Sequence, residues 1–274
     1  MNIVWIDGTL VDEAAARVSP FDHGLLTGDG VFETLRIARG RPFAARRHLE
    51  RLARSAAGMR LPCPDAGVVR EAMDQVIRAN DLAEGRLRVT LTSGPGALGS
   101  DRTAVEPTVI VAAGALPAWP PAADVAVAPW PRNERSPLAG VKSTSYGENV
   151  VALAFARERG AGEAILANLT GRLCEGTGTN VFVGLDGRLV TPPLSSGCLA
   201  GVTRALILEV VEVAEDDLPL AALAEADEAF LTSSTRDIQP IRSVDGNALP
   251  RCPGPLTSAA VAAFRALVAR NDDP

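Results

Sequence analysis

Lysine is almost absent from this sequence. Lys142 is the only lysine among 274 residues, so arginine supplies the rest of the 27 basic side chains. Tyr146, a short distance further on, is the only tyrosine. Arginine can replace lysine as a surface charge, but its guanidinium stays protonated and cannot act as a nucleophilic amine. Lys142 is therefore a candidate for Schiff-base chemistry, and the alternative is an ordinary surface lysine.

The sequence also lacks the features of several protein classes. It has no long uncharged apolar run, no Lys/Arg run and a net charge of −6, so we expect neither membrane nor nucleic-acid binding. No basic segment followed by an apolar run opens the chain, which argues against a signal peptide. The cysteines form no CxxC pair, so we expect no metal site; they are Cys63, Cys174, Cys198 and Cys252. A cytoplasmic protein acting on a small molecule is the expectation.

Hydrophobic periodicity predicts an α/β chain in two parts. Residues 1–114 read as a small α/β domain. The stretch 115–123 is rich in proline, which favours an extended linker. Residues 124–274 would form a larger domain. The predicted helices are 46–58, 66–80, 147–159, 202–214 and 255–269, and strands are expected between them.

A glutamate precedes small and hydroxyl-bearing residues in the stretch 174–182. Glu175 stands between two predicted strands and is followed by Gly176, Thr177, Gly178 and Thr179. Such a backbone lets a ligand approach closely. The carboxylate could face a cationic ring nitrogen; the alternative is a hairpin turn with a solvated glutamate.

Three further stretches could bind a phosphate. Residues 197–204 open a predicted helix, where backbone N–H groups and the Thr203 hydroxyl suit an anion, although Thr203 could instead cap its own helix. Arg51 on helix 46–58 could pair with a phosphate or be an exposed charge. The hydroxyl-rich stretch 231–235 could bind a phosphate or form a polar turn.

Together these residues supply a reactive amine, a carboxylate and several phosphate donors. Pyridoxal 5′-phosphate (PLP) needs this set, because its aldehyde reacts with an amine and its ring nitrogen is held protonated by a carboxylate. A protein that only binds a phosphate ligand is disfavoured, since arginine would serve it as well as the single lysine.

The order of these motifs resembles that of the fold-type IV PLP enzymes, the class-IV aminotransferase family. This family includes branched-chain aminotransferases, D-amino acid aminotransferases and aminodeoxychorismate lyases. The stretches that carry the resemblance are 28–33, 48–52, Lys142, 175–182, 189–193, 199–204 and 227–233. The resemblance implies an α/β fold of the α+β type, with a small N-terminal α/β domain and a larger C-terminal PLP-binding domain of mixed sheets around a barrel-like core. It also implies a homodimer.

The resemblance further implies a role for individual residues. Lys142 would hold PLP as a Schiff base and then serve as acid and base. Glu175 would pair with the pyridine nitrogen, and Tyr146 would hydrogen-bond the ring hydroxyl. The other implied cofactor-binding residues are Arg51, Val202, Thr203, Ser233 and Ser234 around the phosphate, and Thr177 in the Glu175 motif.

Within the family, the sequence favours aminodeoxychorismate lyase. The run 137–142 resembles the lyases' approach to the lysine, and 32–36 resembles many bacterial members of that group. The expected reaction converts 4-amino-4-deoxychorismate to 4-aminobenzoate and pyruvate, a step of folate biosynthesis.

The alternative is an amino-acid aminotransferase acting on branched-chain or D-amino acids. Ser145-Tyr146 stands where branched-chain aminotransferases carry an asparagine-tyrosine pair, and Ser93-Gly94 where D-amino acid aminotransferases carry an arginine. Both differences disfavour this alternative. Arg102, at the end of the loop 93–102, could contact a substrate carboxylate.

Overall fold

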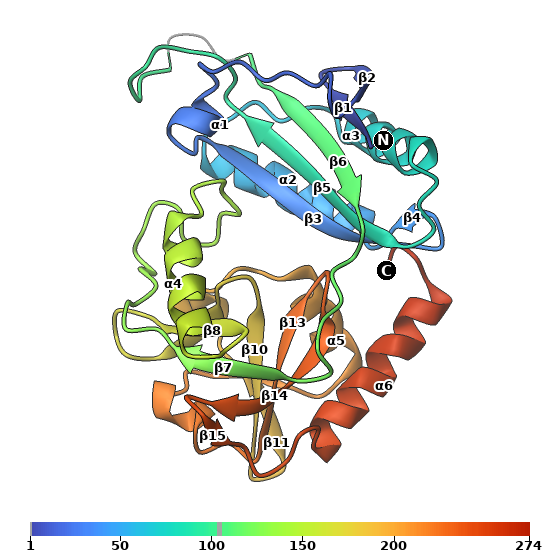
Figure 1. The fold of residues 1–274 in the computed structure, drawn as a ribbon. Coiled ribbons are helices and arrows are strands. Elements are labelled where there is room, and N and C mark those ends of the chain that lie inside the picture. Colours follow the sequence, from blue (N-terminus) through green and yellow to red (C-terminus); the bar gives the residue numbers. More distant parts are fainter. Residues whose placement is uncertain (1, 103–105) are drawn as a thin grey trace. The chain divides into compact units, whose positions relative to one another are not determined.

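The computed structural model describes residues 2–102 and 106–274, and contacts divide it into two compact units (Figure 1). The first unit comprises Met1–Pro117, Val141–Tyr146 and Asp273. The second comprises Ala118–Gly140, Gly147–Asp272 and Pro274. The short stretch with Lys142 therefore packs in the first unit, whereas the sequence placed it with residues 124–274.

The first unit is built on a six-stranded antiparallel sheet in the order β2-β1-β6-β5-β3-β4. Its strands are β1 Ile3–Ile6, β2 Thr9–Asp12, β3 Gly30–Ala38, β4 Arg41–Pro42, β5 Gly85–Thr92 and β6 Val109–Gly114. Asp7 and Gly8 join β1 to β2 with φ of 45° and 97°. Positive φ at both positions matches the twist of a two-residue hairpin.

Two helices of this unit, α2 (Ala45–Gly58) and α3 (Ala66–Ala79), lie within one residue of their predicted bounds. Their apolar stripes enter the same core as the sheet, with Leu52 and Met73 almost fully buried. The Asp65 carboxylate caps α3 by accepting hydrogen bonds from its first N–H groups. A single helical turn, α1 (His23–Leu26), precedes β3, and the Asp22 carboxylate accepts the Gly24 N–H at its start.

The second unit is built on a nine-stranded mixed sheet in the order β12-β11-β10-β13-β14-β7-β8-β9, with β15 paired to β14. Its strands are β7 Ala123–Val127, β8 Glu163–Ala167, β9 Leu173–Gly176, β10 Asn180–Leu185, β11 Arg188–Thr191, β12 Ala214–Glu215, β13 Glu228–Ser233, β14 Asp237–Val244 and β15 Asn247–Ala248. The pairs β11–β12, β14–β7 and β7–β8 are parallel, and the others are antiparallel. The sheet curls until β9 lies beside β10, which confirms the predicted mixed, barrel-like core.

The helices of the second unit are α4 (Gly147–Glu158), α5 (Val202–Val210) and α6 (Pro255–Arg270), with short 3₁₀ turns at Leu194–Ser196 and Leu220–Leu223. The sequence predicted that α5 would run to residue 214, which is wrong. Val211 is already extended, because the chain turns there into β12, which pairs with β11. Tertiary pairing has overridden helix propensity at this end.

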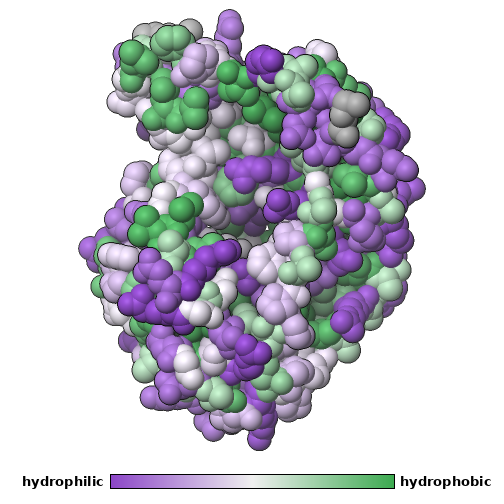
Figure 2. All heavy atoms as spheres, viewed as in Figure 1, coloured by the Kyte–Doolittle hydropathy of each residue, from purple (hydrophilic) through white to green (hydrophobic). Residues whose placement is uncertain are grey.

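None of the helices within residues 2–102 and 106–274 has both the length and the apolar character needed to cross a bilayer. Hydrophobic and hydrophilic residues are interspersed on the face of the molecule drawn in Figure 2.

Candidate functional site

The backbone of Lys142 is fastened to β3 and α2. Phe32 N–H donates to the Lys142 carbonyl at 3.0 Å, and Thr144 N–H donates to the Gly30 carbonyl at 2.8 Å. Lys142 N–H donates to the Ser55 hydroxyl oxygen at 3.1 Å. Through these hydrogen bonds, residues 142–144 lie antiparallel to the start of β3. They fix the backbone position from which the Lys142 side chain extends.

Aromatic rings surround the Lys142 amine. Its Nζ lies 4.5 Å from the centroid of the Phe32 ring and 5.9 Å from that of Tyr146. The two rings meet edge to face at 5.2 Å. Lys142 itself is half-buried.

The guanidinium carbon of Arg88 stacks 3.7 Å from the Phe32 ring centroid, so a second cation lies beside this ring. The sequence did not single out Arg88. The alternation of polar and apolar residues along β5 was the available signal, because it places Arg86, Arg88 and Thr90 on one face of that strand.

Arg51 lies in a buried polar cluster with Glu33 and His48. Its Nε and Nη2 donate to the two oxygens of Glu33 at 2.8 and 2.7 Å. His48 Nδ1 lies 2.6 Å from Oε2 of the same carboxylate. All three residues are buried, so the alternative of an exposed charge at Arg51 is wrong.

The cluster keeps Glu33 ionised. Burial raises the pKa of Glu33, but the Arg51 charge and the hydrogen bonds from Arg51 and His48 outweigh it and lower the pKa to about 2. Burial also lowers the pKa of His48, against the opposing effect of Glu33. His48 is therefore described best as a neutral imidazole that donates Nδ1–H to the carboxylate.

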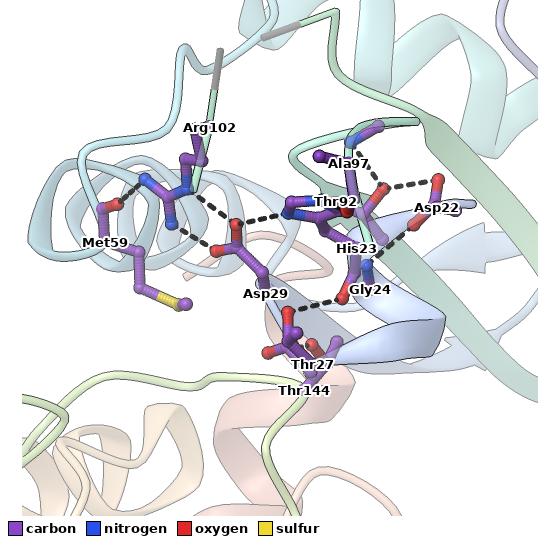
Figure 3. A network of polar contacts seen from close by, with 12 residues as sticks. Asp22, His23, Gly24, Thr27, Asp29, Met59, Thr92, Ala97, Arg102 and Thr144 are labelled. Atoms are coloured by element: carbon purple, nitrogen blue, oxygen red, sulfur yellow. Dashed lines mark hydrogen bonds and ion pairs between the residues drawn. The ribbon is translucent and has the colours of Figure 1, made fainter. Parts of the chain in front are cut away.

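The structure gives Arg102 a different partner from the predicted substrate carboxylate. Its Nε donates to Asp29 at 2.6 Å, its Nη2 donates to the other oxygen of Asp29, and its Nη1 donates to the Met59 carbonyl at 2.8 Å (Figure 3). His23 Nε2 lies 2.7 Å from the Ala97 carbonyl oxygen in the same network. These contacts anchor the loop 93–102 to α1, to Asp29 directly before β3, and to Met59 at the end of α2.

Glu175 lies within β9 and is buried, so the alternative of a solvated turn is wrong. One carboxylate oxygen, Oε1, is 3.2 Å from Nε of Arg132. The other, Oε2, accepts the backbone N–H of Leu199 at 2.9 Å. The sequence singled out Glu175 and the stretch with Leu199 separately. In the fold these two contact each other, and Arg132, which the sequence did not single out, contacts Glu175 as well.

Thr177 is bound to a second buried glutamate. Its hydroxyl and its N–H donate to Oε1 of Glu163. Arg236 Nη2 donates to Oε2 of Glu163 at 2.9 Å, and Asn149 Nδ2 donates to the Thr177 carbonyl. The loop after Glu175 is therefore fixed by Glu163, and the Thr177 hydroxyl is engaged within it.

Val202 and Thr203 form the buried start of α5. The N-cap residue is Gly201, which has no side chain, so the alternative that Thr203 caps this helix is wrong. The Asn180 amide packs against this turn: its Nδ2 donates to the Leu199 carbonyl at 2.9 Å, and a Cβ on Gly201 would lie 2.0 Å from its Oδ1. A helix start without a side-chain cap suits an anion.

Ser233 ends β13, and Ser234 lies in the turn that follows. The Ser233 hydroxyl oxygen accepts the Arg236 N–H at 3.2 Å. Thr232 Oγ1 is buried and has no hydrogen-bond partner among the described residues. Because α5 packs against β13, this unpaired hydroxyl adds to the polar groups that fit a phosphate.

The class-IV aminotransferase model matches residues 30–244, most of the chain. The chain belongs to this family. Members of the family use PLP, so the predictions of family, fold and cofactor are confirmed, as is that of an enzyme. The residue types present fit the cofactor: the first unit offers the Lys142 amine, and the second offers the Glu175 carboxylate and the uncapped start of α5.

Relatives and solved structures are similar over almost their full length. A putative branched-chain-amino-acid aminotransferase of Methanocaldococcus jannaschii is 36% identical over 264 residues, covering 90% of this chain and 89% of the relative. The aminodeoxychorismate lyase of Bacillus subtilis is 32% identical over 256 residues, covering 89% and 87%. The branched-chain amino acid aminotransferase of Escherichia coli superposes with a TM-score of 0.90 at 32% identity, covering 97% of this chain and 94% of that one.

Proposed function

We propose that the protein is a PLP-dependent aminodeoxychorismate lyase, which forms 4-aminobenzoate and pyruvate from 4-amino-4-deoxychorismate. The observation that carries the proposal is the run 137–142, which resembles the lyases' approach to the lysine. The similarity to the B. subtilis lyase supports it.

Lys142 is the proposed catalytic residue. PLP, when bound, supplies an electron sink for the carbon that loses a proton. The Lys142 amine takes that proton from the amine-bearing carbon of the substrate. The Phe32 and Tyr146 rings lie beside the amine, and the hydrogen bond from Lys142 N–H to Ser55 fixes the backbone from which the side chain extends. Loss of the enolpyruvyl side chain then aromatises the substrate ring.

The proposed cofactor-binding residues follow the family resemblance. Glu175 is proposed to hold the pyridine nitrogen and Tyr146 the ring hydroxyl. The proposed phosphate ligands are Arg51, Val202, Thr203, Ser233 and Ser234, and Thr177 is proposed to line the cofactor beside Glu175. Arg88 is proposed to bind a substrate carboxylate, because its guanidinium lies beside the same Phe32 ring as the Lys142 amine.

Amino-acid transamination is the second candidate. It is favoured by the 36% identity to the M. jannaschii relative and by the likeness to the E. coli branched-chain enzyme. Both reactions begin when Lys142 removes a proton from the amine-bearing carbon of its substrate. The reactions differ in the next step. A transaminase returns the proton to the carbon derived from the cofactor's aldehyde and releases a keto acid, whereas the lyase expels the enolpyruvyl group.

Two parallel assays separate the candidates. The purified protein is incubated with chorismate, glutamine and an amidating synthase, and 4-aminobenzoate is measured. In the second assay, branched-chain amino acids or D-alanine are supplied with 2-oxoglutarate. We expect 4-aminobenzoate in the first assay and none with Lys142→Ala. Amino transfer in the second assay without 4-aminobenzoate in the first would replace the lyase by the transaminase.

We also propose a cytoplasmic homodimer, as the family resemblance implies. Light scattering of the PLP-loaded protein at micromolar concentration tests the oligomeric state, and a monomeric mass would contradict it.

A further inference from the structure

Glu33 and Arg51 form a side-on, two-point ion pair inside the first unit. Glu33 follows Phe32 on β3, and its carboxylate receives both Nε–H and Nη2–H of Arg51. Glu33 is 1% exposed and Arg51 5%. We propose that Glu33 is a positioning residue that holds the Arg51 guanidinium in the orientation required for the cofactor phosphate. The proposal rests on the proposed function, which makes Arg51 a phosphate ligand.

The geometry of the pair fixes a plane and a direction. A guanidinium is planar and carries five N–H donors in a rigid fork. Two parallel bonds to one carboxylate remove rotation about the bond axis, which a single bond would allow. The three donors that Glu33 does not use are therefore aimed along fixed directions on the side of the guanidinium away from Glu33.

The burial of the Glu33–Arg51 pair also indicates why it is present. A buried arginine without a counter-charge is costly, and a buried ion pair adds little net stability compared with apolar residues of the same size. The ion pair is therefore better explained by the proposed binding of the phosphate to Arg51 than by a contribution to the stability of the fold. Glu33 lets a charged arginine stay in a buried place before an anion arrives.

His48 fixes the carboxylate itself. It lies three residues before Arg51 on the same face of α2 and contacts Oε2 of Glu33 at 2.6 Å. Burial favours its neutral form. The cluster therefore contains one negative and one positive side chain, and His48 limits the movement of the carboxylate without adding a second charge.

Strand β3 also contacts Lys142, the residue proposed to bind the cofactor covalently. Phe32 N–H bonds to the Lys142 carbonyl, and the next residue, Glu33, binds Arg51. Two consecutive residues of β3 therefore set the positions of the amine and the guanidinium relative to each other. A cofactor held at its aldehyde and its phosphate needs this separation to be constant.

The test compares two ligands that differ in the phosphate alone. Dissociation constants of the apo-protein for PLP and for pyridoxal are measured by visible absorbance, which one lysine per chain makes simple to interpret. For Glu33→Gln we expect the affinity for PLP to fall about tenfold or more and that for pyridoxal to change less than about twofold, because charged hydrogen bonds to the phosphate are misdirected.

A double-mutant cycle shows whether Glu33 acts through Arg51. Arg51→Gln should lower the preference for PLP over pyridoxal, and adding Glu33→Gln should lower it no further. Equal losses for both ligands in Glu33→Gln would overturn the proposal, and so would additive losses in the double variant. An unchanged ligand preference in Arg51→Gln would instead contradict the phosphate assignment in the proposed function.

Two further variants separate an effect on the Arg51 orientation from a general loss of stability. Glu33→Asp retains the charge but shortens the side chain, so we expect it to fold and still to lose preference for PLP; an unchanged preference would overturn the proposal. Glu228→Gln is the matched control. Glu228 is an equally buried carboxylate that accepts hydrogen bonds from Leu256 N–H and from the N–H and hydroxyl of Thr257 at the start of α6. This variant should lower thermal stability and leave the ligand preference unchanged.

Discussion

Nε of Arg132 lies 3.2 Å from Oε1 of Glu175, and Leu199 N–H donates to Oε2 of the same carboxylate at 2.9 Å. Both charged side chains are largely buried, with exposed fractions of 16% and 11%. A positive charge therefore stands beside the carboxylate that is proposed to face the cofactor ring.

Replacing Arg132 by methionine should destabilise the protein by about 2 kcal/mol, because Glu175 would be left as a buried charge without its cation. Unfolding in urea of the cofactor-free protein measures this. The double variant Arg132→Met/Glu175→Gln should recover part of the loss, since it removes the uncompensated charge. A change of less than about 0.5 kcal/mol in Arg132→Met would show that the pair is too well solvated to matter.

The sequence predicted Glu175 but could not predict Arg132. Glu175 stands in a motif of neighbouring residues, whereas its partner lies 43 positions earlier in a stretch with no regular pattern. The two meet because Arg132 N–H bonds to the Ala167 carbonyl at the end of β8, and β8 pairs with β9. Strand pairing of this kind depends on the whole sheet.

Local signals predicted the regular elements well. The helices α2 and α3 lie within one residue of the ranges that hydrophobic periodicity predicted. The position of Lys142 in the first unit was missed, because main-chain hydrogen bonds to β3 carry no side-chain signature. The roles of Glu33 and Asp29 were missed for a similar reason: their partners, Arg51 and Arg102, become neighbours only when helices and loops pack on the sheet.

Gly201 should not tolerate a side chain. A Cβ there would lie 2.0 Å from Asn180 Oδ1, well inside contact distance. Gly201→Ala should therefore displace the Asn180 amide, break its bond to the Leu199 carbonyl and cost about 2 kcal/mol in the free energy of unfolding. The measurement is urea unfolding of both proteins.

A second substitution identifies the cause. Asn180→Ala removes the colliding amide, so Gly201→Ala/Asn180→Ala should be more stable than the sum of the two single losses predicts. Additive losses would show that the turn at Gly201 rejects alanine for another reason. Gly99→Ala is the matched control, because a Cβ there meets no atom within 4 Å.

Asp29→Asn should loosen the loop 93–102. Arg102 would lose its ion pair and keep only its bond to the Met59 carbonyl and a weaker contact to the amide. Hydrogen exchange at the loop amides should become faster, while α3 should exchange as before. The global stability should fall by about 1 kcal/mol, because the pair is partly exposed. Unchanged loop exchange would mean that the loop's other contacts hold it without the ion pair, namely His23 with the Ala97 carbonyl and the main-chain bonds of Ser93, Gly94 and Gly96.

Glu33 should make stability depend on acid pH. Its pKa falls from the usual 4.5 to about 2 in the folded protein, since Arg51 and His48 outweigh the effect of burial. The folded state therefore binds this proton less readily than the unfolded state. The resulting stabilisation is fully present above pH 4.5 and disappears as the pH falls through 4.5 towards 2.

The shift corresponds to about 3 kcal/mol at neutral pH. Urea unfolding of wild type and Glu33→Gln between pH 7 and pH 3 isolates it, because other carboxylates titrate equally in both proteins. The gap in stability between the two should be largest near pH 7 and should narrow steadily below pH 4.5. A gap that is constant with pH would mean that the cost of the substitution is steric, and that the Glu33–Arg51 pair contributes no net charge stabilisation to the folded state.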